Sequence, residues 1–389
     1  MLAVFFNSIT IRAVFSLLTG VLISFILTNN IIKQLVSRQI GQSIREEGPE
    51  EHKVKSGTPT MGGISVVIAV VITSLFWAKI NTFVIIILLT ILWLAAVGFM
   101  DDILIIKEKN NKGLSARKKL LFQTLFAAGL GIYLYMTGLV GTELKIPTLN
   151  IDIELGKFYI LFVMFVVVGS SNSVNLTDGL DGLATGILII VFSVYTGIVY
   201  IVGNSIFSKH LFMKYIAGAE ELTIFCTAIV GALIGFLWYN APPAQIFMGD
   251  TGSLAFGGSL GVIAILSKSE LLLVVIGGIF VIEAISVILQ VGSYKLRKKR
   301  IFLMAPIHHH FEKLGLKETK VVMRFWIVTL LLALVGIGIL GLNVITHKNQ
   351  LKKEKKVEQI QTTTTVKPKE VKKAIEVEVK KDSKIEFKK

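Results

Sequence analysis

Four short segments of this chain combine carboxylates, amides and imidazoles at spacings that could do chemistry. They are Asp101-Asp102, the segment 175–181 with Asn175, Asp178 and Asp181, the loop 240–252 with Asn240, Phe247 and Asp250, and the run His308-His309-His310. Carboxylate and amide oxygens suit Mg²⁺, which takes one or two protein carboxylates and fills its shell with substrate phosphates. Acids and imidazoles gathered in this way indicate catalysis.

Each acidic segment also has a structural explanation. Asp101 and Asp102 could be a solvated pair at the C-terminal end of a helix, although the helix dipole disfavours acids there. Asp178 and Asp181 share one face if they begin a helix, where they could serve as caps. Asp250 stands just before an apolar run and could cap it. Adjacent acids also repel, which can raise a pKa or recruit a cation, and three separated acidic sites favour function.

The histidines and lysines indicate binding of anionic groups. Three consecutive histidines cannot all face one ion on a regular helix, so contact with phosphate or sugar is favoured over a transition-metal site. The basic run 295–300 is either the positive flank of a membrane span or an attractor of lipid phosphate. The segment 55–63 lacks the P-loop pattern, but Lys55 and Thr60 could bind a phosphate at a helix N-terminus. Glu283, inside an apolar run, is either functional or a hydrogen-bond partner that shapes a bent helix.

Long apolar runs separate these segments. The hydrophobic content of 53% and the mean hydropathy of +0.71 exceed those of an ordinary soluble domain. About 20 apolar residues in a helix span a bilayer. Ten runs qualify, near 14–36, 61–79, 82–100, 119–138, 157–173, 183–203, 221–239, 253–267, 271–294 and 321–345, of which 253–267 is short, rich in Gly and the weakest. The chain is therefore predicted to be an all-α, polytopic integral membrane protein with about ten transmembrane helices.

The order of the runs places all four segments at one face of the membrane, because an even number of runs separates each neighbouring pair of sites. The loops on that side, 37–60, 101–119 and 295–320, hold 18 Lys or Arg residues, against 6 on the opposite side. The positive-inside rule makes the richer side cytoplasmic. The net charge of +15 therefore reflects topology in a lipid bilayer, and no nucleic acid partner is expected.

The composition changes after about residue 345. Residues 346–389 are rich in Lys and Glu, a composition that cannot bury a core and is typical of disorder. We therefore divide the chain into a transmembrane catalytic domain, 1–345, and a disordered tail, 346–389. Ten spans place both termini outside the cell, so the lysines of the tail oppose the positive-inside rule. The 18 basic residues of the cytoplasmic loops are expected to outweigh them in setting the topology.

Five motifs in this order resemble one family. GTPTMGG, GFMDD, NLTDGLDGLA, FMGDTGSLAFGG and APIHHHFEKLG are similar to the motifs of the phospho-N-acetylmuramoyl-pentapeptide transferases. These belong to a superfamily that moves sugar-1-phosphates from UDP-sugars to polyprenyl phosphates. The resemblance covers about residues 10–345, and the histidine motif resembles the muramoyl-pentapeptide branch rather than the N-acetylglucosamine branch.

The resemblance implies an enzyme of the bacterial cytoplasmic membrane with its active site on the cytoplasmic face. It would join undecaprenyl phosphate to UDP-MurNAc-pentapeptide with Mg²⁺, giving lipid I and UMP, and it would form a homodimer. Asp250 would bind Mg²⁺, Asp101 would accept a proton from the lipid phosphate or orient it, and Asp102 would support that site. The other implied site residues are His308 in catalysis, and Lys55, Thr60, Asn175, Asp178, Asp181, Asn240, Phe247, His309 and His310 in substrate binding.

Two features depart from the family pattern, and other functions stay open. Family members often carry a basic residue three positions after the second Asp of the acidic pair, where this chain has Ile105, so a phosphate-binding lysine in that loop is unassigned. The Lys-rich tail also lies outside the pattern. The alternatives are an N-acetylglucosamine-1-phosphate transferase, an ion-coupled transporter and a non-catalytic lipid-binding scaffold. Acids at span ends disfavour transport, which needs them near the midplane. A single displacement is favoured over a covalent phospho-enzyme.

Overall fold

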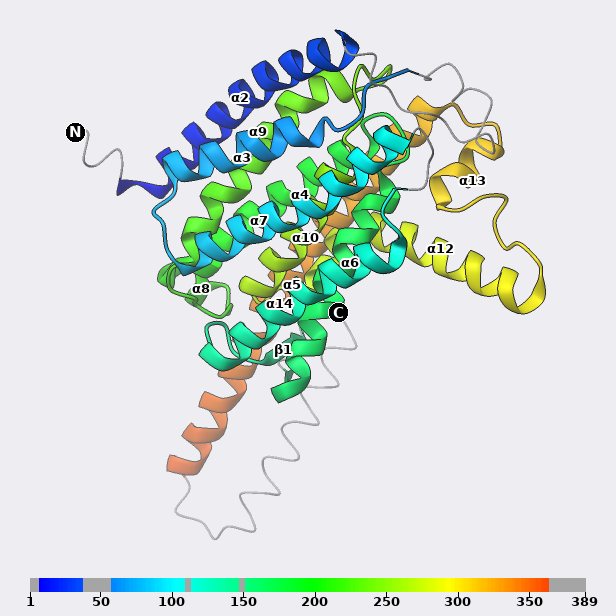
Figure 1. The fold of residues 1–389 in the computed structure, drawn as a ribbon. Helices are drawn as coiled ribbons and strands as arrows, with labels where there is room; N and C mark the ends of the chain where they lie inside the picture. Colours follow the sequence, from blue (N-terminus) through cyan, green and yellow to red (C-terminus); the bar gives the residue numbers. More distant parts are fainter. Residues whose placement is uncertain (1–6, 38–56, 109–112, 147–150, 364–389) are drawn as a thin grey trace.

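The computed structural model describes residues 7–37, 57–108, 113–146 and 151–363, and most of these residues are helical (Figure 1). The α-helices are α2 (Ile9–Ser37), α3 (Gly63–Trp77), α4 (Thr82–Glu108), α5 (Ala116–Thr137), α6 (Tyr159–Thr177), α7 (Leu183–Gly203), α8 (Ser205–His210), α9 (Leu222–Asn240), α10 (Gly249–Leu266), α11 (Glu270–Ile276), α12 (Gly278–Arg297), α13 (Ile307–Lys313) and α14 (Glu318–Thr363). Two short 3₁₀ helices, η2 (Gly156–Phe158) and η3 (Ala219–Glu221), precede α6 and α9.

The predicted membrane spans are confirmed as helices. Within the described ranges, nine helices are long and apolar enough to cross a membrane, and α3 is a tenth apolar helix of 15 residues. One predicted span differs, because the run 271–294 is divided at Gly277 into the seven-residue α11 and the longer α12. Two consecutive glycines, Gly277 and Gly278, weaken the helix at that point. Figure 1 shows α12 and α13 projecting from one side of the bundle.

The span that looked weakest in the sequence is the central helix of the bundle. Every residue of α10 from Thr251 to Leu266 is buried, and α10 packs on α3, α4 and α6. A Cβ atom at Gly63 would lie 2.4 Å from the Cα of Gly252, and one at Gly257 would lie 2.6 Å from the carbonyl oxygen of Ser170. The glycines that lower the hydropathy of this run are therefore what allows neighbouring helices to approach its backbone closely.

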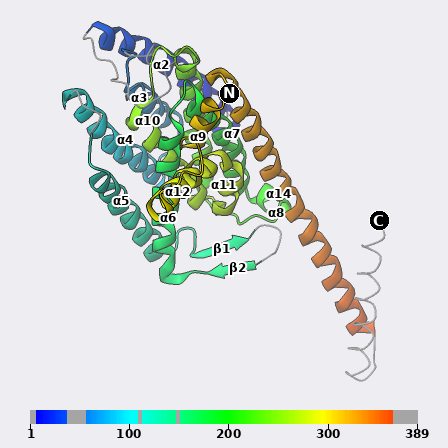
Figure 2. The ribbon, with the colours of Figure 1, turned by 90° about the vertical axis from the view of Figure 1, so that its right-hand side faces the viewer.

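One pair of strands lies in the connection before α6. Strands β1 (Glu143–Ile146) and β2 (Ile151–Glu154) are antiparallel, with Glu143 opposite Glu154 and Ile146 opposite Ile151. The sequence did not indicate this hairpin, because each strand has only four residues. Figure 2 shows the hairpin at one end of the bundle, beside the long helix α14.

Helix α14 extends past residue 345, where the predicted tail begins. It continues without a break to Thr363 and projects well beyond the bundle (Figure 2). Ten of the 18 residues 346–363 are Lys, Gln or Glu, and these three residue types have high helix propensity. A composition that cannot bury a core can still form a helix that is seeded by the preceding membrane span. Residues 364–389 lie outside the described residues.

The acidic segments lie at one end of the bundle, although their local settings differ from those predicted. Helix α4 continues to Glu108, so Asp101 and Asp102 lie inside it and not at its end, because the apolar residues 103–106 extend the helix. Asp178 follows the last residue of α6, and Asp181 lies in the turn before α7, so the two acids do not begin a helix. Met248, not Asp250, is the N-cap residue of α10.

Candidate active site

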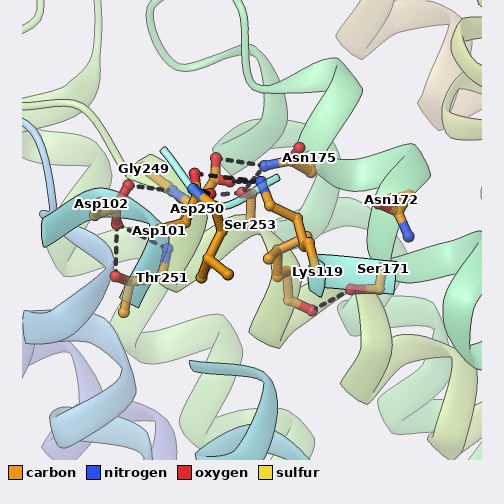
Figure 3. Close-up of polar contacts among 12 residues, drawn as sticks. Asp101, Asp102, Lys119, Ser171, Asn172, Asn175, Gly249, Asp250, Thr251 and Ser253 are labelled. Atoms are coloured by element: carbon orange, nitrogen blue, oxygen red, sulfur yellow. Dashed lines mark hydrogen bonds and ion pairs between the residues drawn. The ribbon is translucent and has the colours of Figure 1, made fainter. Parts of the chain in front are cut away.

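A lysine from α5 joins two of the three acidic segments that the sequence singled out. The Nζ atom of Lys119 forms an ion pair with Oδ2 of Asp250 and lies 3.3 Å from Oδ2 of Asp101. Figure 3 shows Lys119 reaching across from α5 to the first turn of α10. Asp101 is buried, and its Oδ1 atom accepts a hydrogen bond of 2.7 Å from the backbone N–H of Leu114. Two carboxylates from distant segments thus share one ammonium group.

One turn after Lys119, a polar contact holds α5 against α6. The Oε1 atom of Gln123 accepts a hydrogen bond of 2.7 Å from Nδ2 of Asn172. Gln123 lies four residues after Lys119, so the two side chains lie on the same face of α5. The hydrogen bond therefore fixes the rotation of α5 that directs Lys119 toward the carboxylates.

Asp102 has a different task from its neighbour Asp101. Its Oδ1 atom accepts from the backbone N–H of Asp250 at 3.0 Å, and its Oδ2 atom accepts from the N–H of Thr251 at 3.0 Å and from Thr251 Oγ1 at 2.6 Å (Figure 3). These N–H groups belong to the first turn of α10, which lacks partners within the helix and favours negative charge. Asp102 therefore anchors the helix that carries Asp250. Gly98 permits this approach, since a Cβ there would lie 2.2 Å from the carbonyl oxygen of Asp250.

The segment after α6 contributes an amide and a further acid. The Nδ2 atom of Asn175 donates to Asp250 Oδ1 at 2.7 Å and to Ser253 Oγ at 2.9 Å. The carboxyl group of Asp178 accepts a backbone hydrogen bond from Gly249. Burial, reinforced by the nearby carboxylates of Asp250 and Asp102, raises the pKa of Asp178 to about 8. Asp178 therefore keeps its proton to a higher pH than an ordinary aspartic acid does.

The loop before α3 pairs with the loop before α10. Backbone N–H groups of Gly62 and Phe247 donate to the carbonyls of Phe247 and Pro59, each at 2.8 Å. Thr60 is buried, and a Cβ at Gly249, whose φ is +75°, would lie 3.1 Å from its Oγ1 atom. The structure thus places Thr60 and Phe247 beside Asp250. Lys55, predicted to bind phosphate with Thr60, lies outside the described residues.

Two predicted site residues make contacts that hold the loop 241–248 in place. Asn240 is buried and donates from Nδ2 to the carbonyl of Ile246 at 2.9 Å, while its Oδ1 atom accepts from Thr185 Oγ1 at 2.6 Å. The Oδ2 atom of Asp181 accepts from the N–H of Ala244 at 2.9 Å. Both side chains fix the loop that leads to Asp250, and their predicted contact with substrate stays a prediction.

His308 brings the histidine segment to the same end of the bundle. Its ring is fully buried, and Nδ1 lies 3.1 Å from Oε1 of Glu283, whose Oε2 atom accepts from the N–H of Ile307 at 2.9 Å. The Nε2 atom of His308 has no hydrogen-bond partner among the described residues, and a Cβ at Gly179 would lie 2.4 Å from it. Glu283 therefore positions the histidine segment, a role different from the predicted shaping of a bent helix, and the free ring nitrogen of His308 faces the turn after α6.

The other two histidines point in different directions. His309 Nδ1 lies 2.7 Å from Oε2 of Glu312, and His310 Nδ1 accepts from the N–H of Leu303 at 3.2 Å. The three Nδ1 atoms have different partners, and the absence of a transition-metal site at these histidines stays a prediction. The structure brings His308 beside Gly179, in the segment that carries Asp178.

Lys119 is the site residue that the sequence reasoning missed. Its charge is one of six in the loop 101–119, and the family pattern directs attention to Ile105, three positions after the acidic pair. The available signal was its place as the last of three basic residues, Arg117 to Lys119, that open an apolar span. A lysine at the start of a span lies at the same depth as an acid near the end of the preceding one.

The donor set suits a cation of the Mg²⁺ type. Within the described ranges, no three His, Cys, Asp or Glu side chains come together as ligands of a metal ion. Mg²⁺ does not require such a cage, because it binds through one or two carboxylates with water and substrate phosphates. Asp250 and Asp101 share the positive charge of Lys119, and their carboxylates are the residues here that could hold such a cation.

Comparison with known proteins identifies the family. The Glycosyl transferase family 4 model matches residues 84–268, a range that contains Asp101, Lys119, Asn175 and Asp250. A phospho-N-acetylmuramoyl-pentapeptide-transferase of Citrifermentans bemidjiense is 50% identical over 337 residues, which cover 86% of this chain and 94% of that protein. The chain belongs to the phospho-N-acetylmuramoyl-pentapeptide-transferase family.

Two further relatives with this family name agree over the same region. The protein of a Geobacter species is 50% identical over 337 residues, and that of Desulfosudis oleivorans is 48% identical over 338 residues, each covering 86% of this chain and 94% of the relative. The resemblance of the five motifs is thereby confirmed, since the identity extends far beyond them. The family membership disfavours the transporter and scaffold hypotheses for the acidic cluster.

Proposed function

We propose that this chain transfers phospho-MurNAc-pentapeptide from UDP-MurNAc-pentapeptide to undecaprenyl phosphate, forming lipid I and UMP. The observation that carries the proposal is the cluster of Asp101, Lys119 and Asp250 at one end of the helical bundle. The chain is 50% identical in sequence to a phospho-N-acetylmuramoyl-pentapeptide-transferase. A soluble nucleotide sugar and a membrane-bound phosphate can both reach such a position. The names of the relatives also favour the muramoyl-pentapeptide donor over UDP-N-acetylglucosamine.

The chemical difficulty in this reaction is the meeting of two polyanions. The attacking lipid phosphate is already an oxyanion, since a phosphate monoester has a second pKa of about 6. Catalysis therefore depends on positioning and on charge stabilisation more than on activation of the nucleophile. Lys119 supplies a positive charge between the two carboxylates, and it can turn to the diphosphate when substrate enters.

The two adjacent acids divide the work in this proposal. Asp101 lies beside Lys119 and orients the lipid phosphate or takes its remaining proton. Asp102 acts through the backbone, because it holds the first turn of α10 and hence the position of Asp250. We favour a single displacement, since an oxyanion needs no covalent relay. Inversion of configuration at the transferred phosphorus supports that route, and retention supports a phospho-enzyme.

Mg²⁺ is the proposed cofactor, with Asp250 as its ligand and Asp101 beside it. When bound, it would offset the charge of the diphosphate and stabilise the departing UMP. Asn175 supports this arrangement, because its amide fixes the Oδ1 side of the Asp250 carboxylate. Chelation with EDTA should abolish UMP release from the purified protein, and added Mg²⁺ should restore it; activity that survives chelation would exclude a dissociable metal.

The distribution of basic residues supports a site on the cytoplasmic face of the bacterial cytoplasmic membrane. The loops at the end that carries Asp101 and Asp250 hold three times as many Lys and Arg as the loops at the other end, which have 6. The homodimer expected from the family resemblance stays a prediction, and the mass of the protein in nanodiscs tests it.

The choice of nucleotide-sugar substrate distinguishes the two enzyme hypotheses. Purified protein with undecaprenyl phosphate and Mg²⁺ is given equal concentrations of UDP-MurNAc-pentapeptide and UDP-N-acetylglucosamine, and the lipid products are separated by mass. We expect the muramoyl-pentapeptide product alone. A product that carries N-acetylglucosamine would overturn the substrate assignment.

A further inference from the structure

Helix α12 projects from one side of the bundle, and the chain returns from its end to α13 (Figure 1). The outer part of this helix exposes a series of large apolar side chains, and Leu296, next to its last residue, is 87% exposed. The others are Ile282, Ile285, Ile288, Leu289 and Val291. A helix in this setting needs lipid around it, because no other part of the bundle covers these side chains.

A group of five basic residues lies where this apolar helix ends. They are Lys295, Arg297, Lys298, Lys299 and Arg300, which we call the basic cluster, and all five are exposed. The sequence contains no Asp or Glu between Glu283 and Glu312. Five positive charges therefore lie within six residues, with no acidic residue near them along the chain.

The basic cluster is also free of acidic partners in space. In the part of the chain that the structure describes, no carboxylate forms an ion pair with any of its five members. Arg297 Nη2 donates to the hydroxyl of Ser293 at 3.0 Å, and Arg300 Nη1 donates to the carbonyl of Leu303 at 3.4 Å, so both guanidinium groups contact neutral oxygens. A guanidinium group has five N–H donors. The cluster therefore retains both its positive charge and donors for an anion.

The backbone that carries the second half of the cluster is held against α12. Gln290 Oε1 accepts hydrogen bonds of 3.0 Å from the N–H groups of Ile301 and Phe302, and its Nε2 atom donates to the carbonyl of Phe302 at 2.9 Å. The hydroxyl of Ser293 donates to the carbonyl of Lys299 at 2.7 Å. The cluster is thus presented from a fixed backbone, which lowers the entropy lost when a partner binds.

The side chains between the basic residues indicate what kind of partner fits. Leu296 lies between two members of the cluster, and Ile301 and Leu303, which follow it, are 47% and 50% exposed. A partner must therefore offer anionic groups directly beside an apolar layer. A nucleic acid offers phosphates without such a layer. Phospholipids offer both, because their phosphate groups lie above their acyl chains.

We propose that the basic cluster binds anionic phospholipid headgroups in the leaflet on the side of the candidate active site. Arg297 and Arg300 donate to the phosphate oxygens, the lysines add attraction, and the acyl chains lie along the exposed apolar side chains of α12. This interaction does not depend on the proposed reaction. It makes the end of α12 a specific lipid contact, whereas basic residues that only set the topology would not distinguish one lipid from another.

The experiment measures which lipids surround the end of α12 in the full-length chain. Leu296→Cys is labelled with a fluorescent dye; the native Cys226 is buried and does not compete for the label. The labelled protein is reconstituted in phosphatidylcholine vesicles that contain a small fraction of a nitroxide-labelled lipid. Phosphatidylglycerol and phosphatidylcholine that carry the nitroxide at the same acyl position are compared, so a difference in quenching reports the headgroup that the cluster prefers.

Two triple variants in the Leu296→Cys background test the origin of the preference. The cluster variant is Lys295→Gln, Lys298→Gln and Lys299→Gln, which leaves the hydrogen bonds of both arginines intact. The control variant is Lys313→Gln, Lys317→Gln and Lys320→Gln, which removes three exposed lysines outside the cluster. All six side chains are exposed, so both variants should fold, and their unfolding temperatures check this.

We expect labelled phosphatidylglycerol to quench the dye more strongly than labelled phosphatidylcholine in the parent protein. Each basic residue at a membrane surface contributes about 1 kcal/mol, or about fivefold in local affinity. The cluster variant should therefore lose most of the preference, the control variant should keep it, and high salt should weaken it.

Four results would overturn the proposal. Equal quenching by the two lipids in the parent protein would leave the cluster as a topology signal only, and no quenching by either lipid would show that the end of α12 lies outside the bilayer. A preference that survives in the cluster variant would exclude these lysines as its source. An equal loss in the control variant would show an effect of net charge and not of this surface.

Discussion

Replacing Asp102 and Asp101 by asparagine should have different effects: Asp102→Asn should lower stability, and Asp101→Asn should lower turnover. In Asp102→Asn, an amide with one acceptor oxygen replaces a carboxylate that accepts three hydrogen bonds, from Asp250 N, Thr251 N and Thr251 Oγ1. At least one buried donor loses its partner, and a hydrogen bond to a charged group contributes about 1.5–3 kcal/mol. The lost charge at the start of α10 adds about 0.3–1 kcal/mol. We expect a total loss of about 2–4 kcal/mol.

In Asp101→Asn, the hydrogen bond from Leu114 N to Oδ1 is retained, because the amide oxygen can accept it. The ion pair of 3.3 Å with Lys119 is lost, but so is the repulsion between Asp101 and Asp250, which share that lysine. The stability should change by about 1 kcal/mol or less. Turnover should fall about a hundredfold or more, because in the proposed mechanism the lost group orients the lipid phosphate.

The assay is unfolding of both variants in mixed micelles with a graded denaturing detergent, with UMP release measured on the same preparations. We expect Asp102→Asn to unfold at clearly lower denaturant, and Asp101→Asn to unfold as the wild type does while being inactive. Equal stability of Asp102→Asn and the wild type would refute the anchoring role. A larger destabilisation by Asp101→Asn would show that the two roles are reversed.

Three further substitutions test the positioning of the site. Lys119→Met should lower UMP release about a hundredfold, whereas Lys118→Met, on the neighbouring exposed lysine, should keep wild-type activity; equal rates would exclude Lys119 from catalysis. Gly98→Ala places a Cβ 2.2 Å from a backbone oxygen of α10, so it should lower the free energy of unfolding by about 1–3 kcal/mol and abolish activity. Gly129 has open space around it, so Gly129→Ala should be tolerated. An active Gly98→Ala protein with an unchanged unfolding temperature would contradict the close packing of α4 on α10. Glu283→Gln weakens two buried contacts and should lower thermal stability by about 2 kcal/mol; an unchanged unfolding temperature would show that this carboxylate does not hold α13.

The membrane spans and the meeting of the acidic segments could be predicted because both follow from one-dimensional patterns. Apolar runs of the required length specify helices, and counting runs between Asp101, Asn175 and Asp250 places them at one end of the bundle. Composition gave a wrong indication for one span, because the Gly-rich run 253–267, which lies in α10, looked like the weakest membrane helix. Glycine lowers hydropathy and helix propensity, but in a bundle it allows close packing, as at Gly252 and Gly257. That benefit depends on neighbours that the sequence does not identify.

The partners within the site could not be predicted, because they depend on rotation about helix axes. Asp101 and Asp102 are adjacent in sequence, yet one faces Lys119 and the other faces the backbone of α10. Successive residues on a helix point about 100° apart, so their tasks separate only when the neighbouring helices are in place. The same reasoning explains why Lys119 looked like an ordinary positive charge beside a membrane span.

The most direct test of the proposed function is Mg²⁺-dependent release of UMP from UDP-MurNAc-pentapeptide and undecaprenyl phosphate by wild type and Asp250→Ala. Asp152→Ala, which removes an exposed acid at the other end of the bundle, is the control. We predict rapid release by the wild type and the control, and a loss of about a hundredfold or more in Asp250→Ala with the protein still inserted in the membrane. Wild-type release of UMP by Asp250→Ala would contradict the account.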